Sequence, residues 1–195
     1  MNQDHPVGAT PLTPAEEEGL IPSHITLRSE LNELEQANIL EAETWLQTRK
    51  RRTSALDPLF LKRLHRRMFG NIWKWAGHYR KADRNIGVHW PLISSQLELL
   101  CREATAWREE KVFTADELAI RFHHKLVWIH CYPNGNGRHA RLASDLLVME
   151  LGGTRFTWGG GTDLESPNDV RKCYIDSLKA ADQHDHRALL AFARS

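Results

Sequence analysis

Two apolar segments in the second half of the chain, joined by a short loop, constrain its fold more than any other feature of the sequence. The first follows Thr114-Ala115-Asp116-Glu117, a capping-box pattern that marks the start of a helix. Apolar residues then recur at helical spacing in both segments: Leu118, Phe122, Leu126 and Ile129 in the first, and Leu142, Ala143, Leu146, Leu147 and Leu151 in the second. Both stripes are apolar enough to be central, so we predict a pair of central helices.

Further helices are expected around this pair. Their approximate ranges are 29–52, 58–69, 94–108, 167–181 and 185–193. Ser29, Asp57 and Ser166 are residue types that favour the N-cap, and proline follows the latter two at the first helical position. Residues 154–158 are expected to be extended, and residues 83–91, bounded by turn formers, to form a small hairpin or flap. The sequence therefore predicts an all-α helical bundle with a small β-hairpin flap.

The domain organisation is simple. A chain of 195 residues is long enough for one globular domain with a well-formed core. Residues 1–24, rich in Pro, Thr, Gly and Glu, show no periodicity, so we expect a flexible arm that either stays free or ties down onto the domain. Residues 25–195 contain no repeat or boundary and are expected to form a single domain that includes the helix at 29–52.

Composition excludes several classes of protein. Lys and Arg number 26 against 25 Asp and Glu, so bulk charge indicates neither a nucleic-acid nor a membrane partner. The 3 cysteines are an odd number without metal spacing, which favours a reducing compartment. No apolar run approaches a membrane span, and no secretory signal pattern is present. We therefore expect a soluble cytoplasmic protein.

The loop between the central helices, residues 130–141, combines the parts of an anion site. Arg138 and Arg141 fall in the first turn of the second helix, where positive charge opposes the helix dipole, so a bound anion would offset the cost. Gly135 and Gly137 permit the close approach of a ligand to the backbone. His130, at the other lip of the loop, has the side chain of a general base near neutral pH.

Three other interpretations of these residues compete with an anion site. Residues 135–140 match a dinucleotide-binding fingerprint, but that motif requires a preceding strand, and a helix precedes this one. The loop is also compatible with an ordinary interhelical turn with solvated arginines. His123 and His124 with His130 suggest zinc, although their spacing places the side chains on different helix faces.

The loop resembles the signature of the Fic (filamentation induced by cAMP) family, His-x-Phe-x-(Asp/Glu)-Gly-Asn-Gly-(Arg/Lys)-x-x-Arg. Tyr132 stands at the aromatic position of that signature, and six further residues match it: His130, Gly135, Asn136, Gly137, Arg138 and Arg141. The resemblance extends to residues 75–80 and 85–86, upstream of the flap, and covers roughly residues 25–193. The short loop variant is similar to a compact branch of the family called mobile mystery protein B.

The resemblance implies transfer of a nucleoside monophosphate, usually AMP from ATP, onto a protein hydroxyl. By the resemblance His130 deprotonates the acceptor Ser, Thr or Tyr, and Mg²⁺ accompanies the nucleotide. The phosphates are assigned to the backbone nest at residues 135–137 and to Asn136, and their β/γ side to Arg138 and Arg141. The flap at Gly87, Val88 and His89 is expected to register the target's backbone by strand addition. Tyr174 is either a nucleobase-stacking residue or a helix-packing one.

One position departs from the family signature. Asn134 stands where the family has the acidic residue that ligates Mg²⁺. An amide oxygen can coordinate a hard cation but contributes no charge, so metal affinity should fall. By this argument magnesium is held mainly by the nucleotide, or the activity is weak, altered or lost.

The helix predicted at 29–52 raises the question of inhibition. Many Fic proteins carry an inhibitory (Ser/Thr)-x-x-x-Glu-(Gly/Asn) helix whose glutamate pairs with the second arginine of the signature. Ser29 and Glu33 fit the core of that pattern, but Leu34 replaces the final Gly/Asn. We expect either an inhibitory Glu33–Arg141 ion pair or a solvated Glu33 favoured by the helix dipole.

The sequence thus predicts a Fic-type nucleotidyltransferase that uses ATP or another nucleoside triphosphate to modify a protein hydroxyl. Its expected partners are the nucleotide, the target protein and a second copy of the chain in a homo-oligomer. The alternative is a nucleotide-binding regulatory or toxin–antitoxin-like module with little catalysis.

Overall fold

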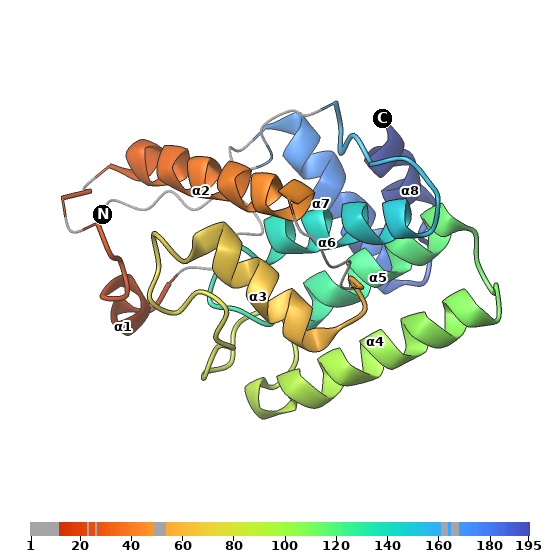
Figure 1. Ribbon diagram of the computed structural model, residues 1–195, viewed down its shortest axis with the longest axis horizontal. Helices are drawn as coiled ribbons and strands as arrows, with labels where there is room; N and C mark the ends of the chain where they lie inside the picture. Colours follow the sequence, from red (N-terminus) through yellow and green to blue (C-terminus); the bar gives the residue numbers. More distant parts are fainter. Residues whose placement is uncertain (1–11, 23, 26, 49–53, 161–163, 165–167) are drawn as a thin grey trace.

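The computed structural model describes residues 12–22, 24–25, 27–48, 54–160, 164 and 168–195, and the described residues are mostly helical (Figure 1). The helices are α1 (Pro14–Glu17), α2 (Arg28–Thr48), α3 (Pro58–Phe69), a 3₁₀ turn η1 (Trp90–Leu92), α4 (Ile93–Glu109), α5 (Ala115–Ile129), α6 (Asn136–Glu150), α7 (Asp169–Asp182) and α8 (Arg187–Arg194). The predicted all-α class is confirmed.

Two helix starts carry the predicted capping residues, whereas the N-cap predicted at Ser29 is wrong, because α2 already begins at Arg28. Thr114 caps α5 and forms the complete capping box with Glu117. Asp57 caps α3, with Pro58 at the first helical position. The N-cap of α7 is Asn168, whose side chain accepts from the N–H of Arg171. The predicted cap at Ser166 lies outside the described residues, and so do residues 49–52 of the helix predicted at 29–52.

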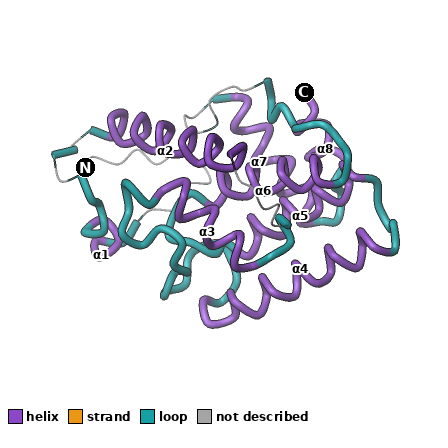
Figure 2. The backbone as a smooth tube through the Cα atoms, in the orientation of Figure 1, coloured by secondary structure: helices purple, strands orange, loops and turns teal. Residues whose placement is uncertain are grey.

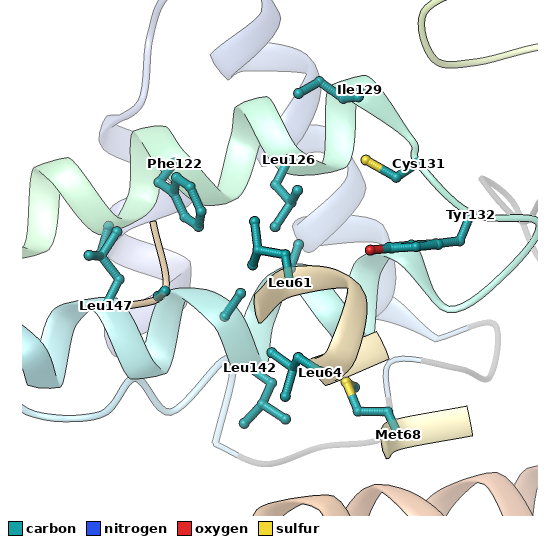
Figure 3. Packing of buried hydrophobic residues seen from close by; sticks show 14 of the residues in the cluster. Leu61, Leu64, Met68, Phe122, Leu126, Ile129, Cys131, Tyr132, Leu142 and Leu147 are labelled. Carbon is teal, nitrogen blue, oxygen red and sulfur yellow. The ribbon is translucent and has the colours of Figure 1, made fainter. Parts of the chain in front are cut away.

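The core lies between α3, α5 and α6. Figure 3 shows apolar side chains of α3 facing residues of α5 and α6, with the ring of Tyr132 from the intervening loop beside them. The residues at this junction include Leu61, Leu64, Met68, Phe122, Leu126 and Leu147, all buried. The central pair predicted from the apolar stripes is therefore the centre of the fold, and it carries the loop at one end.

The remaining helices cover this centre from different sides. In Figure 1, α2 runs along one side of α3 and α4 along the other, and α2 packs against α3 while α4 packs against α5. Helices α7 and α8 pack on each other, and α8 also contacts α5. Helix α2 thus reaches the loop region from outside the α3–α5–α6 core.

The described part of the segment predicted as an arm is tied to the domain. Residues 12–22 include α1 and an isolated antiparallel bridge between Leu20 and Trp73. Ile21 N–H donates to Ile72 C=O at 2.8 Å, and Trp75 Nε1 donates to Glu16 C=O at 3.0 Å. Tying down, rather than free mobility, describes these residues; residues 1–11 lie outside the described part of the chain.

The predicted β-hairpin is not found. Figure 2 shows no strand in the described part of the chain, and residues 83–89 form bends that lead into η1. Side chains take the backbone groups that a hairpin ladder would use: Asp83 accepts from Trp90 N–H at 2.8 Å, and Arg80 donates to Val88 C=O. The flap is a loop shaped by these two side chains.

The cysteines and the apolar character of the helices were also considered in the sequence. Cys101 and Cys131 are buried, Cys173 is exposed, and none of the three is paired in a disulfide. Among the described helices, none combines the length and apolar character that crossing a membrane requires.

Candidate active site

The loop begins and ends in left-handed backbone conformations. His130 is the C-cap of α5 with φ 54° and ψ 63°, and Gly135 is the N-cap of α6 with φ 76°. A Cβ atom on Gly135 would lie 2.6 Å from the ring of Phe69, so glycine is required there both for its dihedral angles and for space. The two turns place the end of α5, at His130, and the start of α6, with Arg138, at the two ends of one short loop. We call these two ends the His130 lip and the Arg138 lip.

The side chain of Asn136 holds the loop closed. Its Oδ1 accepts from Tyr132 N–H at 2.9 Å, and its Nδ2 donates to Tyr132 C=O at 2.8 Å. Both ends of the amide are therefore used within the loop, and Asn136 is only 5% exposed. Because both ends of the amide are engaged, we expect the predicted phosphate contact of Asn136 to come from its backbone.

His65 supports the middle of the loop from α3, a role that sequence reasoning missed. The ring is fully buried and stacks on Tyr132 with 3.6 Å between ring centroids. Its Nδ1 accepts from Gly77 N–H at 3.0 Å, and its Nε2 lies 3.1 Å from Asn134 C=O. These contacts need a neutral ring, and burial lowers the pKa of His65 well below its usual value.

His130 is held as a neutral imidazole. The residue is 7% exposed. Burial first, and then the charges of Arg80 and Arg84, lower its pKa to about 4. Its carbonyl oxygen accepts from Arg80 Nε at 2.7 Å. A ring that is unprotonated at neutral pH is able to accept a proton, as a general base must.

A carboxylate from α2 compensates the positive charge at the start of α6. The first turn of α6 contains no acid, although Arg138 stands there. Glu35 of α2 supplies the carboxylate: its Oε2 lies 2.8 Å from Arg138 Nη1, and its Oε1 accepts from Trp73 Nε1 at 2.6 Å. Arg138 also lies over the ring of Phe69, 4.9 Å from the centroid. The pair is buried, with side-chain exposures of 10% for Arg138 and 5% for Glu35.

The residues predicted to form the inhibitory pair lie elsewhere. Ser29 and Glu33 are exposed on α2, and Glu33 fits the solvated alternative rather than the predicted pair with Arg141. The acid of α2 that reaches the loop is Glu35, two residues later. Its spacing from Leu31 and Asn38 places it on the buried face of α2, which is the sequence signal that would have found it.

Arg141 and Tyr174 form the far side of the site. The guanidinium of Arg141 lies over the ring of Tyr174, 5.5 Å from its centroid. The hydroxyl of Tyr174 is 3.0 Å from His123 Nε2, and its ring packs on Phe192 with 5.5 Å between the ring centroids. Tyr174 is 4% exposed, so the packing alternative describes it and its ring is not presented for nucleobase stacking.

Of the other predicted residues, Gly137 lies beside Arg141, and the flap residues lie beside the end of α5. Gly137 lies in the first turn of α6, where an added Cβ would be 3.7 Å from Arg141 Nη1. Gly87 has φ 95°, and a Cβ there would be 2.7 Å from the Cβ of His130. Val88 N–H donates to Ile129 C=O at 3.4 Å, while His89 is exposed and contacts Asp83. The flap residues therefore border the His130 lip directly.

The zinc alternative is not supported. His124 Nε2 lies 2.8 Å from Asp182, on α7, and His123 faces Tyr174. Over the part of the chain that the structure describes, no three His, Cys, Asp or Glu side chains are grouped to hold a metal ion. These histidines are packing and hydrogen-bonding residues.

Asn134 does not present a free metal ligand. Its Oδ1 accepts from the N–H of Gly135 at 2.6 Å, so the amide oxygen is engaged within the loop. The amide carries no charge, and a hard divalent cation prefers carboxylate ligands. The residues present at this position do not fit a magnesium site held by the protein.

The sequence is similar to those of known proteins. Residues 55–148 match the model of the Fic/DOC family. A protein adenylyltransferase Fic from Aedes aegypti is 29% identical over 133 residues, and the same protein from Drosophila erecta is 31% identical; each alignment covers 66% of this chain and 25% of the relative. The chain thus spans about a quarter of the length of these relatives.

Solved structures share the fold. The BepC protein of Bartonella tribocorum, solved with bound AMPPNP, superposes with a TM-score of 0.68 at 16% identity and covers 93% of this chain and 97% of its own. Fic-1 from C. elegans superposes with a TM-score of 0.66 at 24% identity, covering 91% of this chain and 51% of its own. The resemblance to the mobile mystery protein B branch stays a prediction.

Proposed function

Because this chain belongs to the Fic/DOC family, we propose that it transfers AMP from ATP, or another nucleoside monophosphate from its triphosphate, onto a hydroxyl group of a target protein. The observation that carries the proposal is the pairing of a neutral, buried His130 with arginines across one closed loop. The similarity to curated adenylyltransferases and to a neighbour that holds AMPPNP supports the nucleotide substrate.

The proposed reaction assigns one role to each lip of the loop. The target's hydroxyl oxygen attacks the α-phosphorus. The bond between the α-phosphorus and the oxygen that links it to the β-phosphorus breaks, and pyrophosphate leaves. His130 accepts the hydroxyl proton as the oxygen attacks. Arg138 and Arg141, three residues apart in the first two turns of α6, bind the β- and γ-phosphates, because planar guanidinium groups match phosphate geometry.

The same geometry supports restraint of the site by α2. Glu35 occupies Arg138 through a buried pair, so a triphosphate must displace that carboxylate before Arg138 can bind it. Trp73 fixes the second oxygen of Glu35 and keeps it pointed at the loop. We assign the inhibitory role expected of the N-terminal helix to Glu35 in place of Glu33.

The flap is the proposed docking site for the target. Both backbone groups of Val88 are hydrogen-bonded within the protein, because its N–H donates to Ile129 C=O and its C=O accepts from Arg80. Gly87 and His89, on either side of it, are exposed. Main-chain pairing with a target segment would therefore use Gly87 and His89, and it would leave the target's side chains unrestricted.

A nucleotide-binding module with little catalysis is the second candidate, and the observation that favours it is Asn134. The loop lacks the charged ligand at that position, and the amide oxygen already accepts from Gly135. Such a module would bind nucleotide through the same arginines without transferring the nucleotidyl group.

Incubation with a panel of α-labelled nucleoside triphosphates separates these functions. Protein-bound label in the wild type but not in His130→Ala supports transfer. Binding of nucleotide by both proteins, with no label in either, supports the module. Label that persists in His130→Ala would contradict the proposed role of His130.

A further inference from the structure

Arg80 is a buried residue whose guanidinium is surrounded by backbone carbonyl groups. It is 2% exposed, and its side chain reaches the end of α5 and the flap together. Nε donates to His130 C=O at 2.7 Å, Nη1 donates to Ala82 C=O at 2.8 Å, and Nη2 donates to Val88 C=O and, at 3.5 Å, to Ile129 C=O. One side chain therefore bonds three separate parts of the chain.

The charge of Arg80 is compensated mainly by those carbonyl groups. The carbonyls of Ile129 and His130 lie at the C-terminal end of α5, where the helix dipole is negative. In the described residues its ion-pair partner is Asp83, which is exposed and 3.7 Å away. Five N–H donors in a rigid plane can serve acceptors in several directions at once, which a lysine ammonium cannot do in the same geometry.

His130, whose carbonyl group accepts from Arg80, needs such support. His130 has φ 54°, a left-handed conformation that is unfavourable for a residue with a side chain. Its carbonyl group is the point that the Nε–H of Arg80 fixes. The backbone N–H of Arg80 also donates to Cys131 C=O at 3.0 Å, so both peptide units after His130 are held by the same residue.

We propose that Arg80 is the positioning residue of the site: it holds His130 in its left-handed conformation at the lip of the loop and ties that conformation to residues 82–88. The catalytic part of this inference rests on the proposed function of His130. The geometric part does not, because the position of His130 can be measured without any activity.

Gly87 is the second contact between the flap and His130. A Cβ atom at this residue would lie 2.7 Å from the Cβ of His130 and 2.8 Å from Arg80 Nη2. The flap backbone therefore rests directly on both residues. A displacement of the flap reaches His130 through this contact and through Arg80.

The first test replaces Arg80 with lysine in the full chain. Arg80→Lys keeps the charge but loses the planar fork, so the ring signals of His130, assigned in NMR spectra with His130→Ala, should shift. In AMP transfer, kcat should fall about 10- to 100-fold, as expected for a misplaced reacting group, while KM for the nucleotide changes by less than about twofold.

Arg194→Lys is the matched control. Arg194 also binds carbonyl groups and an acid, those of Thr154, Arg155 and Asp116. Asp116 is in the first turn of α5, about 20 Å along the helix from His130. This variant should lower the unfolding temperature without moving the ring signals of His130 or changing kcat.

A second pair of variants keeps the proposal testable if Arg80→Lys does not fold. Gly87→Ala and Gly152→Ala both place a side chain at positive φ, 95° and 86°, but an added Cβ at Gly152 meets no atom within 4 Å. Gly87→Ala should shift the ring signals of His130, and Gly152→Ala should not.

The proposal is overturned if neither Arg80→Lys nor Gly87→Ala moves the signals of His130, or if Arg80→Lys changes only the unfolding temperature, as its control does. If the wild type transfers no nucleotide at all, the proposed function fails, and the NMR shifts still decide whether Arg80 positions His130.

Discussion

The two lips of the loop are fixed in contrasting ways. The His130 lip is held by Arg80, which bonds carbonyl groups at the end of α5 and in the adjoining flap. The Arg138 lip is held by Glu35, which comes from α2, and α2 lies outside the residues that match the family. The first restraint comes from within the residues that match the family. The second comes from a helix outside those residues, so substitution of Glu35 tests it separately from the contacts of Arg80.

The difference suggests a division of labour. A base must stay in place through every reaction cycle, and a restraint from within the core suits that requirement. A phosphate-binding arginine must exchange its partner each time a nucleotide binds, and a carboxylate from a separate helix allows that exchange. Variants that loosen both lips, and variants that act on only one of them, test this difference.

The largest expected effect is on the support that the two lips share. His65→Ala removes the ring stacked on Tyr132 and leaves Gly77 N–H and Asn134 C=O without their partner. Loss of a buried ring together with unsatisfied polar groups should cost about 3 kcal/mol or more in the free energy of unfolding. Urea denaturation measures this, with His89→Ala, an exposed histidine, as control. Equal stability of the two variants would show that His65 does not support the loop.

Acidification should weaken the core around both lips by a smaller amount. Burial lowers the pKa of His123 to about 3 and those of His130 and His139 to about 4. The unfolded chain binds protons near pH 6.5 and the folded chain does not, so stability is full above that pH and falls as pH drops toward 4.

Between pH 7.5 and pH 6 the three histidines together should cost about 2 kcal/mol. Urea denaturation at the two pH values gives the difference. A stability that stays constant or rises over this interval would contradict the assignment of neutral buried rings.

Asn134→Asp should act on the loop with a smaller effect. It restores the acidic residue of the family signature at a position whose oxygen now accepts from Gly135. If position 134 faces the nucleotide's metal, transfer rates at limiting Mg²⁺ should rise roughly three- to tenfold, because a carboxylate contributes charge as well as an oxygen. The measurement is labelling rate against Mg²⁺ concentration. Unchanged dependence on Mg²⁺ would argue against that placement.

Glu33→Gln should have the smallest effect and serves as the control for α2. Glu33 is exposed, and an exposed charge change away from a buried network usually alters stability by less than about 0.5 kcal/mol. Unfolding and labelling should both match the wild type. An increase in labelling would return the inhibitory role to Glu33.

Much of the fold could be predicted because its signals are local. The capping box at Thr114, the Asp57-Pro58 start of α3 and the apolar stripes of the central pair each depend on residues within a few turns of each other. The hairpin prediction failed for the opposite reason. Whether residues 83–89 pair as strands depends on Arg80 and Asp83, whose side chains take the flap's backbone groups.

In the site, too, residues close in sequence could be predicted and contacts distant in sequence could not. The residues of the loop are contiguous, so a single stretch of sequence was enough to identify them. His65, Arg80 and Glu35 reach the loop from other elements, and their bonds to Asn134, His130 and Arg138 span 69, 50 and 103 residues. Of these three, only Glu35 had a signal in the spacing, as an acid on the buried face of a helix.

The most direct test of the central claim compares self-labelling from α-labelled ATP by three proteins: wild type, Glu35→Gln, and Glu35→Gln combined with His130→Ala. Glutamine keeps an oxygen for Trp73 but removes the charge that occupies Arg138. A restrained transferase predicts about tenfold faster labelling in Glu35→Gln, the equivalent of roughly 1.4 kcal/mol, and none in the double variant. Labelling by Glu35→Gln no faster than by the wild type, or label that persists without His130, would contradict it.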